Sequence, residues 1–97
     1  MQDGREPSNE KQDRVRRLIA DALDYSGIVD HSGVSVRTKL VDEGCPVELT
    51  DLRIDSLAIM EACIYLEGNS GLLIEPATFQ KVSSLGQLVD LIVRQLP

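Results

Sequence analysis

Apolar residues recur with the period of an α-helix in three segments, and this pattern constrains the fold most. In the first segment they occupy positions 15, 18, 19, 22 and 23, which lie on one face of a helix. Asn9 followed by Gln12 predicts a capping box at its start, and Gly27 predicts a left-handed stop after its end. The spacing therefore predicts a helix over residues 10–25.

Two further helices are predicted behind good capping residues. Asp55 precedes a helical pattern from Ser56 to about Leu66, which the pair Gly68-Asn69 is expected to end. Ser84 and Gln87 form a second capping box, in front of a helix over residues 84–95. A short helical turn fits residues 77–81. The expected fold is all-α: a small four-helix bundle of three main helices and one short helix.

The stretch from Ser26 to Ile54 keeps no helical period. A loop this long is uncommon in a compact domain and is usually functional. Three short apolar pieces are expected to pin it to the core: residues 34–36, 40–41 and 47–49. A pair of short strands around Val34-Ser35-Val36 is the less favoured alternative. We expect a flexible tail over residues 1–9, followed by one domain over residues 10–97.

The charge of the chain is unevenly distributed. Residues 1–40 carry seven acidic and seven basic side chains, whereas residues 41–97 carry nine acidic and three basic, which accounts for the net charge of -6. An acidic chain repels phosphate backbones and anionic membranes, so nucleic acid and membranes are not expected as partners. Cys45, Cys63 and the single histidine do not form a zinc motif, and buried or idle thiols are expected in place of a disulfide. The polar start and the lack of a long apolar run favour a cytoplasmic protein. We expect it to be a monomer.

The helix that begins at Ser56 has two apolar faces. With side chains about 100° apart, one face holds Ile59, Ala62, Cys63 and Leu66, and the nearly opposite face holds Leu57, Met60 and Ile64. Either the long loop covers the second face or the helix is central and buried all round, or else that face is exposed and binds partners. Glu61 and Glu67 flank it and would steer it toward basic surfaces.

Ser56 lies at the start of this helix, directly after the long loop. Unpaired backbone N–H groups and the positive end of the helix dipole favour a phosphate ester there. An ordinary first-turn serine is the simpler alternative, because serine is common at helix starts.

The segment Asp55-Ser56-Leu57-Ala58-Ile59-Met60-Glu61 resembles the D-S-L-x-x-x-E attachment motif of acyl carrier proteins. The resemblance extends over roughly residues 10–96, through Thr38–Asp42 upstream and through Lys81–Ser84 and Leu88–Ile92 downstream. It implies a four-helix bundle with a long first loop, and it implies no catalytic activity of the chain itself and no metal.

The resemblance also implies a cofactor and partners. Ser56, with Asp55 and Leu57 beside it, would receive 4'-phosphopantetheine from coenzyme A through a phosphopantetheinyl transferase. The thiol of that arm would carry an acyl group as a thioester, loaded by a ligase or acyltransferase and passed to downstream biosynthetic enzymes. The implied partner-binding residues are Leu57, Met60, Glu61, Ile64, Glu67 and Arg53.

The chain departs from the usual family pattern at several positions. Arg53 replaces a usual glycine, Ala58 a frequent acid, and Gly68 and Ser70 a usual Glu and Phe; residues 44–51 resemble an insertion. These changes favour a carrier for a specialised fatty acid, polyketide or related pathway. An aminoacyl or peptidyl carrier and a helical interaction module without the cofactor stay open. A hydrolase with Ser56 as nucleophile and His31 as base is disfavoured by the lack of G-x-S-x-G.

Overall fold

The structure is a computed structural model that describes residues 7–42 and 47–96. The first helix, α1 (Pro7–Ser26), begins three residues before the predicted start. Proline is favoured in a first helical turn because its missing N–H would have no partner there. Asn9 therefore lies inside the helix, and the predicted capping box at Asn9 is wrong. The predicted stop is confirmed, since Gly27 takes a left-handed φ of 74°.

The other helices are α2 (Ser56–Ser70), α3 (Pro76–Lys81) and α4 (Leu85–Gln95). The predicted end of α2 at Gly68-Asn69 is wrong, because the helix continues to Ser70 and ends at Gly71. Gly71 has a φ of 76°, and its N–H donates to the carbonyl of Glu67 at 2.9 Å. A glycine inside a helix costs about 1 kcal/mol, and the ordered cap at Gly71 offsets part of that cost.

The capping prediction for α4 is confirmed. The Ser84 hydroxyl accepts the backbone N–H of Gln87 at 3.3 Å. In return, the Gln87 side chain accepts the N–H of Ser83 at 2.8 Å, one residue before the position that a capping box would use.

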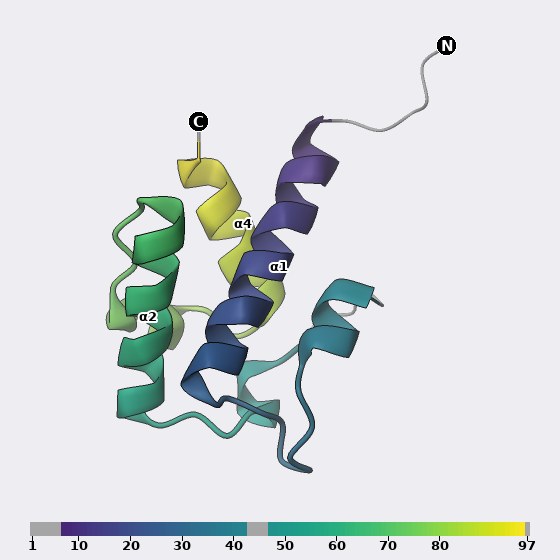
Figure 1. Ribbon diagram of the computed structural model, residues 1–97, viewed down its shortest axis with the longest axis vertical. Helices are drawn as coiled ribbons and strands as arrows, with labels where there is room; N and C mark the ends of the chain where they lie inside the picture. The colour runs from purple at the N-terminus through teal and green to yellow at the C-terminus, as the bar shows by residue number, and fades with distance from the viewer. Residues whose placement is uncertain (1–6, 43–46, 97) are drawn as a thin grey trace.

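The four α-helices of the described residues pack as the predicted bundle, with α1 against both α2 and α4 (Figure 1). The predicted stripe on α1 is buried, apart from the partly exposed Leu18, and so are the matching faces of the other helices. The largest fully buried side chains are Ile19, Leu23, Ile28, Leu40, Leu66, Leu85, Leu88, Ile92, Val15 and Val89.

The segment between α1 and α2 contains two short helical turns, the π-helical η1 (Thr38–Asp42) and the 3₁₀-helical η2 (Leu49–Asp51). In place of the alternative pair of strands, its described part makes two isolated bridges, Asp30 with Leu52 and Glu48 with Ser84. Each predicted apolar piece contributes a buried residue, namely Val36, Leu40 and Val47. Gly44, Cys45 and Pro46 lie outside the described residues.

The η1 turn packs against α1 on the side away from α2 (Figure 1). Arg37 fastens it there, because its guanidinium contacts Asp21 at 2.5 Å and Asp24 at 2.7 Å. Both carboxylates raise the pKa of Arg37, Asp21 more strongly, so the side chain stays charged. The described part of the segment therefore leaves one face of α2 uncovered.

Candidate functional site

Ser56 is exposed at the first position of α2. The preceding residue, Asp55, has an extended backbone, and its carboxylate accepts the N–H of Ala58 at 2.7 Å, which confirms the predicted cap. The remaining N–H groups of a first helical turn have no acceptor inside the helix, so this end of α2 is partially positive. A hydroxyl placed there is accessible and well suited to a negatively charged ester.

The chain just before Ser56 is bonded to the loop that follows α1. The N–H of Arg53 donates to the carbonyl of Val29 at 2.8 Å, and the guanidinium of Arg53 donates to the carbonyl of His31 at 2.7 Å. The imidazole of His31 is hydrogen-bonded to the carbonyl of Thr50 at 2.9 Å. The partner of the imidazole is thus a backbone carbonyl, and the structure does not pair His31 with the Ser56 hydroxyl.

The second apolar face of α2 is exposed. Leu57 and Ile64 are each 64% exposed and Met60 is 51% exposed, and we call these three side chains the apolar patch. On the other side of the helix, Ala62, Cys63 and Leu66 are buried and Ile59 is partly buried. The two interpretations that bury the second face, a covering loop and a helix buried all round, are therefore wrong. Glu67 is exposed and Glu61 is half-buried. The patch and the acidic side chains beside it therefore suit a partner surface that is apolar and basic.

A groove of about 200 Å³ continues the apolar patch toward α3. Sequence reasoning missed this feature, although the run Leu72-Leu73-Ile74 in the loop before α3 was a signal, and Leu73 is 68% exposed. The groove is lined by Met60, Cys63, Ile64, Glu67, Leu73, Ile74, Glu75 and Pro76.

Burial raises the pKa of the Cys63 thiol, which keeps it protonated and unreactive at neutral pH.

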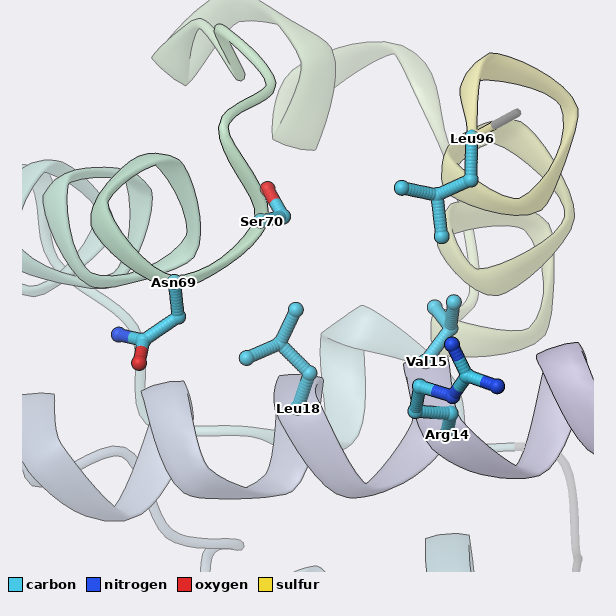
Figure 2. Close-up of a pocket in the computed structure, with 6 residues that line it drawn as sticks. All are labelled: Arg14, Val15, Leu18, Asn69, Ser70 and Leu96. Carbon is cyan, nitrogen blue, oxygen red and sulfur yellow. The ribbon is translucent and has the colours of Figure 1, made fainter.

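A second hollow, of about 220 Å³, lies at the other end of α2 (Figure 2). Val15 and Leu18 of α1 form its floor, with Asn69 and Ser70 at the end of α2 and Leu96 after α4 around it. Lys11 donates to the carbonyl of Leu96 at 3.2 Å, so a cation offsets the negative end of α4. Asn69 is 13 residues along α2 from Ser56, about 20 Å at 1.5 Å per residue, so this hollow is remote from the serine.

Residues 7–42 and 47–96 hold no group of three or more acidic, histidine or cysteine side chains that could bind a metal ion. Within the same residues, no helix has the length and apolar character that crossing a bilayer requires.

The structure is a small helical bundle with an exposed serine at a capped helix start, beside an exposed apolar patch. In a comparison with curated proteins, the chain is 29% identical over 83 residues to an acyl carrier protein of Thermotoga maritima. The match covers 86% of this chain and 88% of that protein. No protein-family model matches the chain, and no solved structure matches it significantly. The resemblance to the acyl carrier protein family is confirmed, and it supports a carrier function.

Proposed function

We propose that this protein carries acyl intermediates on a 4'-phosphopantetheine arm attached to Ser56. The observation that carries the proposal is the exposed hydroxyl at the first position of α2, next to the Asp55 cap and the apolar patch. The similarity to an acyl carrier protein over most of the chain supports it independently. The arm would supply a thiol that holds the acyl group as a thioester.

The residues at the start of α2 fit such an arm. The Ser56 side chain is exposed, so a transferase can reach its hydroxyl. A phosphodiester there would lie at the positive end of the helix dipole, and Asp55 satisfies only one of the first-turn N–H groups. The role of the chain is to anchor the arm and present it, and this role requires no catalytic residue.

The direct test is the intact mass of the protein after incubation with coenzyme A and a promiscuous phosphopantetheinyl transferase. We expect the mass to rise by one phosphopantetheine group. The Ser56→Ala variant should keep its mass, and Ser83→Ala, which removes another exposed hydroxyl, should still gain the arm. An unchanged mass of the unmodified wild-type chain would contradict the proposal.

The apolar patch is proposed as the surface that transferases, loading enzymes and downstream biosynthetic enzymes contact. Ile64→Glu places a charge at the end of the patch that borders the groove, on a side chain outside the core. We expect the apparent KM of the transferase for the carrier to rise at least about fivefold, the loss of about 1 kcal/mol at a contact residue. The melting temperature should stay close to wild type.

Val34→Glu is a matched control, since Val34 is also more than half exposed but belongs to the loop after α1 and not to α2. An equal rise in KM for the two variants, or a large drop in melting temperature for Ile64→Glu alone, would count against the patch as a docking surface.

A specialised fatty acid, polyketide or related pathway in the cytoplasm is the setting we propose, because Arg53, Ala58, Gly68 and Ser70 depart from the usual family pattern. An aminoacyl or peptidyl carrier is the second candidate. Mass analysis of the protein isolated from its own cells distinguishes the two, since the mass added beyond the arm identifies the cargo.

A further inference from the structure

We propose that Arg53 and His31 are positioning residues for Ser56, and that they act by cross-bracing the chain just before α2. The brace consists of the hydrogen bonds that join residues 29–31 to residues 50–53. This inference rests on the proposed function, because it assigns the brace the task of presenting Ser56 to the enzyme that modifies it.

The brace contains two bonds from backbone to backbone and two from side chain to backbone. Arg53 N–H donates to Val29 at 2.8 Å and His31 N–H donates to Asp51 at 3.2 Å, which together form the isolated bridge between Asp30 and Leu52. The side chains then bond in opposite directions. Arg53 donates to the His31 carbonyl at 2.7 Å, and the His31 ring bonds to the Thr50 carbonyl at 2.9 Å. Each segment thus holds the backbone of the other.

Both segments of the brace are also anchored to the body of the protein. Ile28 and Leu52 are buried, so the core holds one residue in or beside each segment. At the far end, the Asp30 carboxylate accepts the N–H groups of Ser32 and Val34, both at 2.9 Å, and closes the turn that follows. Only Ile54 and Asp55 separate Arg53 from Ser56, and Asp55 is already fixed as the cap of α2.

The position of the brace indicates a local role. Arg53 and His31 are both exposed, and hydrogen bonds at the surface add little to global stability. They do bias the local opening of the segment that bears them. A segment that opens locally presents the serine correctly for a smaller fraction of the time. The apparent affinity of an enzyme for it falls by that fraction, while the rate of the bound complex does not change.

The test compares Arg53→Met, which removes the donor, with Arg53→Lys, which keeps a cation and a donor. His31→Ala removes the ring but leaves Arg53 and the carbonyl that it contacts. Arg94→Met is the matched control, because Arg94 is an exposed arginine in the last turn of α4. For each variant, hydrogen exchange is measured at the backbone amides of positions 31 and 53. The melting temperature and the kcat and apparent KM of a phosphopantetheinyl transferase are measured as well.

We expect Arg53→Met and His31→Ala to speed exchange at both amides about fivefold, to raise the apparent KM with kcat unchanged, and to lower the melting temperature by only a few degrees. Fivefold is the change in the local opening constant that corresponds to about 1 kcal/mol of lost hydrogen bonding, and it is the upper limit for the rise in KM. Arg53→Lys should recover most of the loss, and Arg94→Met should behave as wild type.

A rise in KM for Arg53→Met without faster exchange, or an unchanged KM for His31→Ala, would overturn the inference, because Arg53 would then contact the enzyme directly. A wild-type protein that never gains the arm would instead overturn the proposed function, and the positioning role with it. The two failures are therefore distinguishable.

Discussion

The role of Asp55 can be predicted from the sequence because its hydrogen bond is local. A carboxylate that accepts the N–H three residues further along the chain needs no tertiary contact, so the sequence is enough to predict the cap at the start of α2. The bonds of Arg53 and His31 are different, since they link residues 19 and 22 positions apart. The sequence places the charge of Arg53 close to Ser56 along the chain, but it does not predict that Arg53 contacts the carbonyl of His31.

Asp30 makes a prediction that depends on pH. Hydrogen bonds from the Ser32 hydroxyl, the Val34 N–H and the Ser32 N–H lower its pKa below the ordinary value of an aspartate. A folded-state pKa below the unfolded one means that the ionised carboxylate stabilises the fold above about pH 3.8, and that this contribution disappears as the pH falls through the lower, folded value.

We therefore expect Asp30→Ala to have a lower melting temperature than wild type at neutral pH, and the gap to close as the pH falls below about 4. Thermal unfolding of both proteins across that range is the measurement. A gap that persists at the lowest pH would show that the effect of the substitution does not come from the charge.

At the scale of the helices, a repeating apolar pattern predicts the buried and exposed faces more reliably than a single residue predicts where a helix begins or ends. The two faces of α2 follow from their spacing alone, and the structure places one face inside and the other outside. The two helix ends that were wrong both depended on isolated residues. Gly68 can either end a helix or continue it, and the cap that decides between them forms only at Gly71. Pro7 starts α1 before the apolar pattern becomes visible.

The faces of α2 can be checked by truncation. Leu66 is 1% exposed, so Leu66→Ala should lower the free energy of unfolding by about 2–5 kcal/mol, the usual cost of a cavity in a core. Ile64→Ala removes a similar side chain from the exposed face and should cost less than about 1 kcal/mol. Urea unfolding measures both values. Equal losses would mean that the two faces are buried alike.

At the scale of the whole molecule, the long segment between α1 and α2 was the hardest part to predict. Its apolar pieces are short and irregularly spaced. They predict that the segment contacts the core, but they do not predict on which side of the bundle it packs. That side is set in part by Arg37, which bonds to α1 through two carboxylates 13 and 16 residues earlier in the chain. Because η1 lies on the far side of α1, the apolar patch stays open (Figure 1).

Arg37→Met tests how strongly this fastening holds. More than a third of the Arg37 side chain is exposed, so water and salt screen the ion pairs, and we expect the free energy of unfolding to fall by no more than about 1 kcal/mol. The difference from wild type should shrink when unfolding is repeated in 1 M NaCl, where the screening length is about 3 Å. A loss that is the same in high salt would point to packing of the side chain as its main contribution.

The contact between Lys11 and Leu96 holds the start of α1 and the end of α4 together, at the end of α2 remote from Ser56. A bead, a sensor surface or a fused protein attached at the start of α1 or at the end of α4 would therefore lie at the end of the bundle remote from Ser56. On the proposed function, the protein should gain the arm as fully when it is immobilised in this way as when it is free in solution.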